Sequence, residues 1–177
     1  MIISLDDANK LDPSITQDDL DAFEASVREL TNNNFQNTFV RFKNVEFVNE
    51  NTVLVKDKII GLRVGDTVEV NYSHYNDGLY VIDQIDGKQV TVQGAPFFAG
   101  NTGHAILTKV EYPADVKRGV KKLIEYDRAM SGKVGIKSET IARMSITYYD
   151  VTAAESSEGY PVSLLGFLDK YRKLRWS

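Results

Sequence analysis

Few residues of this chain have the types and spacing that catalysis or metal binding requires. The sequence contains no cysteine, which excludes disulfides, thiol nucleophiles and cysteine-ligated metals together. The two histidines, His74 and His104, have no second histidine or cysteine at metal-ligand spacing, so we expect each to be a turn or strand residue. Asp77, Asp83 and Asp86 do not have the spacing of a calcium-binding loop.

A carboxylate in an unusual position is the remaining candidate for chemistry. Asp127 falls inside an apolar stripe, where an acid must find a partner or lie where the stripe meets water. We expect a structural ion pair or hydrogen bond there rather than a lone catalytic acid. The sequence has no phosphate-cradling loop, no dinucleotide fingerprint and no nucleophile-elbow motif that would support a Ser-His-Asp triad. We therefore expect a protein that is not an enzyme and that uses no cofactor or metal.

The stripe that contains Asp127 belongs to a two-faced helix predicted over residues 113–130. Pro113 suits the first helical position, where its missing N–H costs nothing. Gly119 lies beside the stripe, where glycine costs about 1 kcal/mol relative to alanine, so we expect another backbone to approach it closely. The apolar face comprises Val116, Val120, Leu123, Ile124 and Met130. The opposite, cationic face comprises Lys117, Arg118, Lys121, Lys122 and Arg128.

Two further helices are predicted near the N-terminus. Residues 4–10 allow one or two turns with Ser4 as the N-cap. Thr16 begins a longer helix, because T-Q-D-D places an acid three residues after the cap, as in a capping box. Asn32-Asn33-Asn34 ends this helix, since asparagine readily adopts the left-handed conformation. Its apolar stripe comprises Leu20, Phe23, Val27 and Leu30.

Residues 38–112 change from helical periodicity to strict alternation, which predicts five or six short antiparallel strands. Asp86-Gly87 is a strong hairpin signal. The aromatic residues could stack on single-stranded nucleic acid, but residues 31–112 contain seven Lys or Arg against nine Asp or Glu. We therefore expect them to serve the core and strand pairing. They are Tyr72, Tyr75, Tyr80, Phe97 and Phe98.

Together these elements predict an α+β fold. A small helical bundle from residues 1–37 and 113–177 would carry an inserted antiparallel β-barrel-like module at residues 38–112. After the helix, residues 141–150 alternate as a strand and residues 151–159 are predicted to form a mobile loop or hairpin tip. Pro161 begins a last helix. Its apolar side comprises Leu164, Phe167, Leu168, Tyr171 and Leu174.

The net charge of −4 conceals an asymmetry along the chain. Residues 1–30 carry eight acids against Lys10 and Arg28, whereas residues 113–150 carry eight bases against five acids, and residues 169–177 carry four bases against one acid. The acidic N-terminal part and the basic C-terminal part can pair within one chain, or head to tail with another copy. The sequence contains no run of about 18 apolar residues, so it predicts no membrane span. Its acidic N-terminus does not resemble a secretion signal.

Three stretches in this order resemble the head–tail connector (adaptor) proteins of tailed phages and prophages. The first is DPSITQDDLDAFEASVRELTNNNF, and the second is VKRGVKKLIEYDRAM, which follows a proline. The third begins with IKSETIARMSITYYD and continues through a variable loop and a Tyr-Pro pair to VSLLGFLDKYRKLRW. The resemblance covers roughly residues 1–35 and 113–177, and its most distinctive motif is Lys-Ser-Glu, alternating strand, Tyr-Pro, helix. The β module at residues 38–112 departs from the family, whose short members hold a compact helical bundle.

The resemblance implies a structural virion protein at the neck, assembled in the host bacterial cytoplasm. It implies a homo-oligomeric, dodecameric ring beneath the portal protein that extends the DNA channel and joins the capsid to the tail. The implied partners are other copies, the portal, a stopper or tail-completion protein, and double-stranded DNA that passes without sequence-specific contact; no membrane is involved. Alternatives are a head-completion stopper, a tail-completion protein, or a monomeric β-barrel binding module.

Three groups of residues follow as candidate sites. The portal-docking arm implied by the resemblance comprises Leu164, Phe167, Leu168, Tyr171, Arg172, Leu174, Arg175 and Trp176. The charge asymmetry predicts an inter-subunit contact between a basic set, Lys117, Arg118, Lys121 and Lys122, and an acidic set, Asp18, Asp19, Asp21 and Glu24. The resemblance also implies a hairpin near the channel that includes Lys137, Ser138, Glu139 and Arg143.

Overall fold

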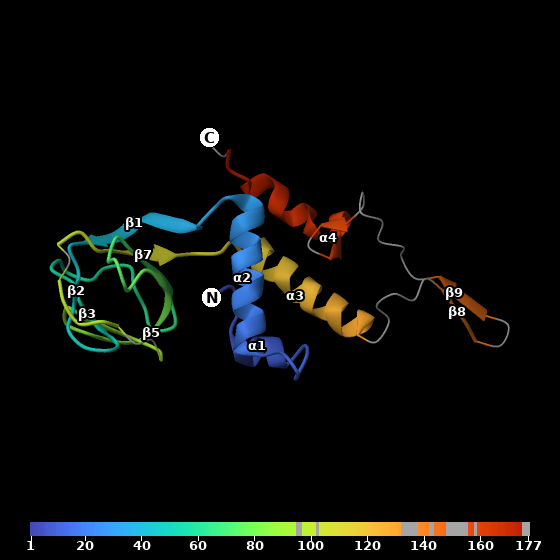
Figure 1. Cartoon of the computed structure of the whole chain (residues 1–177), viewed down its shortest axis with the longest axis horizontal. Helices are drawn as coiled ribbons and strands as arrows, with labels where there is room; N and C mark the ends of the chain where they lie inside the picture. Colours follow the sequence, from blue (N-terminus) through green and yellow to red (C-terminus); the bar gives the residue numbers. More distant parts are fainter. Residues whose placement is uncertain are drawn as a thin grey trace. The chain divides into compact units, whose positions relative to one another are not determined.

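The computed structural model describes residues 1–94, 97–101, 103–131, 138–141, 144–147, 156–157 and 159–174. The fold is α+β, as predicted, and the chain divides into two units (Figure 1). The first unit comprises Met1 and Asn33–Tyr112, and the second comprises Ile2–Asn32 and Pro113–Ser177. Both ends of the chain therefore contribute to the second unit, and the helices of the described residues all belong to it.

The first unit is built on a seven-stranded antiparallel sheet. Its strands are β1 (Gln36–Lys43), β2 (Glu46–Phe47), β3 (Thr52–Leu54), β4 (Thr67–Asn71), β5 (Gly78–Asp86), β6 (Gln89–Val92) and β7 (Ile106–Val110). They lie in the order β1-β7-β4-β5-β6-β3-β2. Among the described residues no ladder joins the edge strands β1 and β2, so the sheet is open rather than closed into the barrel that we expected.

The sheet curls around a single hydrophobic core. Val68 and Leu107 from β4 and β7 belong to the same buried cluster as Val53 and Val90 from β3 and β6. One face of each strand therefore supplies the core, as the period-2 alternation predicts. The Asp-Gly hairpin is confirmed between β5 and β6, where Gly87 has a φ of +57° that residues with a side chain rarely adopt.

Helices α1 (Leu5–Asn9) and α2 (Gln17–Thr31) begin and end as their sequence predicts. The Ser4 hydroxyl accepts a hydrogen bond from the Asp7 N–H. Thr16 and Asp19 form a capping box in which each side chain accepts from the other's backbone N–H. Asn32 ends α2 in the left-handed conformation, with a φ of +48°.

Helix α3 (Ala114–Met130) presents its apolar stripe to the interior of the second unit, and Pro113 is its N-cap rather than its first residue. The predicted strand at residues 141–150 is described only in part: Ile141 ends β8 (Ser138–Ile141), and β9 (Met144–Thr147) pairs with β8 in an antiparallel ladder that satisfies their backbone groups. Residues 142–143 and 148–150 lie outside the described residues. Strands β10 (Ser156–Ser157) and β11 (Tyr160–Pro161) precede α4 (Val162–Leu165).

The last predicted helix is shorter than expected and changes its type. After α4 the chain continues as a 3₁₀-helix, η1 (Gly166–Tyr171), instead of reaching Leu174 as an α-helix. Gly166 stands at the junction, where its poor α-helix propensity favours a change of geometry. As a result Leu165 and Leu168 are buried, while Leu174 falls outside the helix and is exposed.

Candidate functional site

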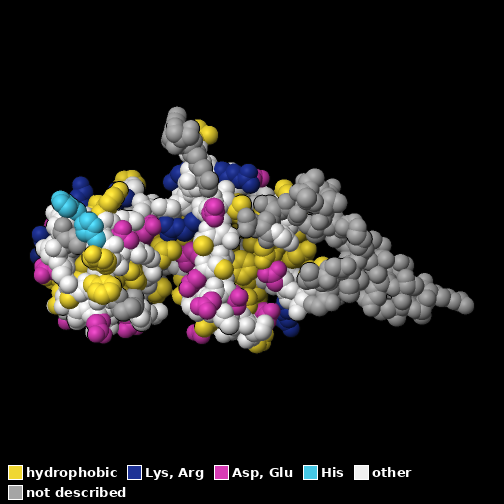
Figure 2. Space-filling model, in the orientation of Figure 1, with side chains coloured by type: hydrophobic (Ala, Val, Ile, Leu, Met, Phe, Trp, Pro, Cys, Tyr) yellow, Lys and Arg dark blue, Asp and Glu magenta, His cyan; other side chains and the backbone are white. Residues whose placement is uncertain are grey.

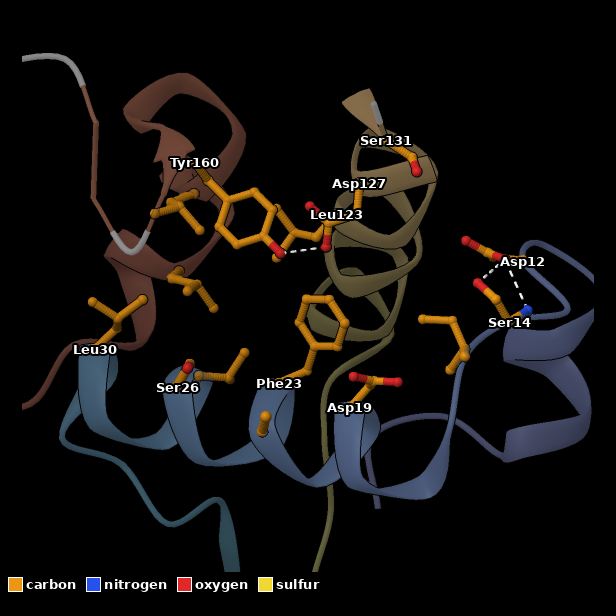
Figure 3. Close-up of a pocket in the computed structure, with 15 residues that line it drawn as sticks. Asp12, Ser14, Asp19, Phe23, Ser26, Leu30, Leu123, Asp127, Ser131 and Tyr160 are labelled. Atoms are coloured by element: carbon orange, nitrogen blue, oxygen red, sulfur yellow. Dashed lines mark hydrogen bonds between the residues drawn. The ribbon is translucent and has the colours of Figure 1, made fainter. Parts of the chain in front are cut away.

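A groove of about 440 Å³ lies between α2 and α3 in the second unit (Figure 3). Its floor is apolar and buried, with Val27 from α2, Leu123 from α3, and Leu168 from η1. Half-buried Phe23 forms part of its wall. The lining residues are Asp12, Ser14, Ile15, Asp19, Ala22, Phe23, Ser26, Val27, Leu30, Leu123, Asp127, Ser131, Tyr160, Leu165 and Leu168.

The charged side chains that line the groove are all acidic. They are Asp12, Asp19 and Asp127, and no lysine or arginine accompanies them. Hydrogen bonds from the Ser14 side chain and backbone lower the pKa of the Asp12 carboxyl, and those from Thr16 do the same for Asp19. Both acids are therefore ionised at neutral pH. An apolar floor with a carboxylate border favours a partner that brings apolar groups together with hydrogen-bond donors.

Asp127 has the structural hydrogen bond that we expected. The Tyr160 hydroxyl donates to Asp127 Oδ2 at 2.5 Å, which joins β11 to α3 (Figure 3). Partial burial raises the pKa of the Asp127 carboxyl, and the hydrogen bond from Tyr160 opposes that shift. Burial, and then the bond to Asp127, also raises the pKa of the Tyr160 hydroxyl. Tyr160 therefore stays protonated and remains a donor.

Gly119 allows close approach of an aromatic ring, not of a backbone as we predicted. A Cβ at this position would lie 2.5 Å from Cδ2 of Phe167, far inside van der Waals contact. Phe167 belongs to η1, 48 residues further along the chain in sequence numbering. The glycine thus lets the C-terminal segment pack directly on α3.

The residues predicted as a portal-docking arm divide into a packed part and an exposed part. Leu168 is 1% exposed, and the Tyr171 hydroxyl donates to Asp115 at the start of α3 at 2.7 Å. Leu174 is 77% exposed, although its carbonyl accepts a hydrogen bond from the Asn32 side chain. Arg172 is exposed and Leu164 is half-buried. Arg175 and Trp176 lie outside the described residues.

Asp115 makes the attachment of this segment dependent on pH. Hydrogen bonds from Lys170 and Tyr171 lower the pKa of the Asp115 carboxyl to about 2, from 3.8. A carboxyl with a lowered pKa in the folded state stabilises the fold above pH 3.8, and this contribution is lost as the pH falls towards 2. We expect Asp115→Asn to lower the melting temperature at neutral pH, and we expect this difference to shrink as the pH falls below 3.8 and to vanish only below the folded-state pKa of about 2. Thermal unfolding of the wild type and the variant between neutral pH and pH 2 checks this prediction. A difference in melting temperature that stays constant with pH would contradict it.

The predicted basic and acidic sets both lie in the second unit, where some members have partners in their own chain. Lys121 approaches Asp7 at 3.7 Å, and Asp19 belongs to the capping box. Glu24 is buried, which removes it from any surface contact. The remaining members are exposed: Lys117, Arg118, Lys122, Asp18 and Asp21. In the predicted channel hairpin, Ser138 and Glu139 lie in β8, and Lys137 and Arg143 lie outside the described residues.

Our prediction that the aromatic residues of the first unit serve its core is wrong for three of the five. Phe97 is buried and Tyr80 packs against the core, as expected. Tyr72, Tyr75 and Phe98 are exposed. The sequence carried one signal of this outcome, because Tyr72 and Tyr75 lie in Asn-Tyr-Ser-His-Tyr-Asn-Asp-Gly, whose composition is typical of a turn.

The described residues lack two kinds of feature. They contain no group of three histidine or acidic side chains that could hold a metal ion. In the same part of the chain, no helix combines the length and the apolar character that crossing a bilayer requires.

Comparison with solved structures gives a weak likeness. No family model matches the chain, and no curated protein matches it. A solved structure described as "Neck of empty GTA particle computed with C6 symmetry" contains a similar chain, with 11% sequence identity and a TM-score of 0.26. The match covers 89% of this chain and 77% of that chain. Because a TM-score this low does not establish a common fold, the likeness assigns this chain to no family.

Proposed function

We propose that this chain is a structural protein of the neck of a phage-like particle. In this role it is a head–tail connector that forms a homo-oligomeric ring under the portal, extends the DNA channel and joins the capsid to the tail. One observation carries the proposal: the separate stretches that resemble connectors contact one another within the second unit. Asp127 of α3 accepts from Tyr160 of the Tyr-Pro motif, and Gly119 receives the ring of Phe167 from the last helix.

The surface of this unit also supports assembly rather than chemistry. The groove combines an apolar floor with acidic borders, an arrangement that suits side chains of another polypeptide. The exposed lysines and arginines of α3 supply a positive surface on the same unit. We propose that Lys117, Arg118 and Lys122 face Asp18 and Asp21 of a neighbouring copy in a ring of twelve.

In this proposal, the exposed part of the portal-docking arm makes the contact with the portal. Leu174 and Arg172 are exposed, and Arg175 and Trp176 follow them in the sequence. Tryptophan and arginine are enriched among residues that dominate binding energy. A head-completion stopper or tail-completion protein is the alternative, and it differs in binding to a connector ring instead of to the portal.

The test is the mass of the particle that the purified chain forms with and without a portal protein, measured by light scattering and electron microscopy. We expect a ring, and we expect Lys117→Glu with Lys122→Glu to weaken it, more strongly at low salt. Exposed pairs contribute only about 0–1 kcal/mol each, so the effect of two reversals is partial. Reversal of Lys43 and Lys58, exposed bases of the first unit, is the matched control. A stable dimer that does not bind the portal protein would contradict the proposal.

A further inference from the structure

The groove in the second unit has an apolar end and an acidic end. Figure 3 shows Ser26 and Leu30 of α2 at one end, and Asp12 and Asp19 at the other. Figure 2 shows apolar side chains exposed on this unit, with acidic side chains beside them. Apolar surface in contact with water is stabilised when another apolar group covers it. Because no lysine or arginine lines the groove, a segment that combines apolar and basic side chains matches it best.

The C-terminal arm makes its last described contacts at the apolar end of the groove. The Lys173 N–H donates to the Thr31 carbonyl at 2.8 Å, and the Asn32 side chain donates to the Leu174 carbonyl at 3.2 Å. Leu30, which lines the groove, precedes Asn32 by two positions, or about 3 Å along the axis of α2. The residues after Leu174 therefore start beside this end of the groove. We call Leu174, Arg175 and Trp176 the arm tip.

The arm tip has the length and the chemistry to cover the apolar end. Val27 on the groove floor lies five positions before Asn32, or about 8 Å along the helix axis. Two extended residues span about 7 Å, and the side chain of Trp176 extends this reach. A tryptophan ring buries about 150–250 Å² and needs an acceptor for its N–H when it is buried. The Ser26 hydroxyl, at the same end of the groove, offers that acceptor.

Electrostatic attraction also favours this end of α2 for the arm tip. Residues 170–177 contain four bases and no acid. Lys170 and Arg172 each pair with an acid, whereas Arg175 follows the last described attachment point. Cations are stabilised at the C-terminal end of a helix, and α2 ends at Thr31. The carboxylates of the groove add to this attraction.

We propose that the groove is the docking site of the chain's own arm tip, with the Trp176 ring on its apolar floor and Arg175 at its acidic border. A contact within one chain involves no loss of translational freedom between two molecules, so it requires far less area than an interface between proteins. The short connection to Leu174 also holds the ring at a high effective concentration beside the groove.

The inference rests on the proposed function in one respect, because that function assigns the same residues to the portal contact. The groove and the portal then compete for Trp176. In this scheme the chain exposes its groove to another polypeptide only after the portal has bound the arm, which places portal binding before later contacts in assembly.

The test uses the fluorescence of Trp176, because it is the only tryptophan in the sequence. The reference is Phe39→Trp with Trp176→Ser, which moves the single tryptophan to a position that is 98% exposed. We expect acrylamide to quench the wild-type emission about 3-fold or more weakly than that of the reference, as for a ring that is docked most of the time. Equal quenching of the two proteins overturns the proposal.

A groove variant and its control locate the docked ring. Ser26→Phe fills the apolar end from within the groove lining, whereas Ala25→Phe places the same ring at an exposed position of α2 outside the lining. Circular dichroism confirms that both variants are folded. We expect Ser26→Phe to raise quenching to the level of the exposed reference and Ala25→Phe to leave it at the wild-type level. Protection that survives Ser26→Phe overturns the groove as the docking site.

Two further measurements do not depend on the folding of a groove variant. Arg175→Glu changes a residue outside the described fold, and we expect the added negative charge beside the groove carboxylates to increase the quenching of Trp176. Unchanged quenching in this variant counts against the acidic border as the site of Arg175. Protection that is lost when the wild type is diluted places the ring on a second copy and overturns the contact within one chain.

Binding to a portal protein separates this inference from the proposed function. If about nine chains in ten hold the arm in the groove, releasing it tightens portal binding about tenfold, because apparent affinity falls with the fraction of competent chains. We therefore expect Ser26→Phe to bind the portal more tightly than Ala25→Phe, and equal affinities overturn the competition. A protected Trp176 in a chain that binds no portal supports the docked arm and contradicts the connector role. An exposed Trp176 in a chain that forms portal-bound rings does the reverse.

Discussion

Replacing Leu168 by alanine is expected to destabilise the second unit by about 2–5 kcal/mol, the range for a leucine deleted from a packed core. The side chain is 1% exposed and forms part of the groove floor with Leu123 and Leu165. The lost stabilisation includes both the transfer of its methyl groups out of water and the cavity that they leave. A docking arm held away from its own chain would show no such effect.

Urea unfolding followed by the helical signal at 222 nm measures this change, because all helices of the described residues belong to the second unit. The control is Leu174→Ala, the same substitution six residues later on a side chain that is 77% exposed. We expect the control to fall within about 0.5 kcal/mol of the wild type. Equal effects of the two substitutions would show that Leu168 does not pack as described.

The packing of Leu168 changes how the C-terminal segment can serve assembly. Lys173 donates its backbone N–H to the Thr31 carbonyl at 2.8 Å, so the attachment to the chain's own α2 continues beyond η1. Removing residues 161–177 would therefore damage the unit itself and could not separate docking from folding. Removing residues 172–177 spares Leu165 and Leu168 and tests portal binding directly.

Features set by neighbouring residues could be predicted from the sequence. The capping box of Thr16 and Asp19 and the left-handed end at Asn32 depend on residues within one turn of each other. The antiparallel pairing of β5 and β6 follows from a two-residue connection that allows no crossover. These local rules also identified the apolar stripe of α3 and the need of Asp127 for a hydrogen bond.

Features set by distant residues could not be predicted in the same way. The partner of Gly119 is a ring far along the chain, and its identity depends on how η1 crosses α3. The exposure of Tyr75 depends on Asp77 and Asn76, whose hydrogen bonds turn the loop outward against the usual preference of aromatic residues for the core. The groove requires α2, α3 and the C-terminal segment together, so its lining has no signature in any one stretch.

Replacing Gly119 by leucine is expected to destabilise the second unit by about 3 kcal/mol or more, despite the better helix propensity of leucine. The new Cβ would lie 2.5 Å from Cδ2 of Phe167, and the remaining atoms would extend into the space that the ring occupies. Overpacking a filled site typically costs about 1–3 kcal/mol, and leucine adds four carbons here. Leucine recovers less than about 1 kcal/mol of helix propensity relative to glycine, which does not offset this cost.

Combining Gly119→Leu with Phe167→Ala shows whether the Phe167 ring causes the loss of stability. Phe167→Ala alone should cost roughly 2 kcal/mol, below the range for a fully buried phenylalanine because this ring is half-buried. The double variant should be more stable than the sum of the two single effects by over about 1 kcal/mol, since leucine then fills the space that the ring leaves. Gly166→Leu is the matched control, because the nearest atom to a Cβ there is 3.9 Å away and the residue is exposed. Additive losses in the double variant would mean that Gly119 is not required for the C-terminal segment to pack on α3, and the contact that joins the two connector-like stretches would have to lie elsewhere.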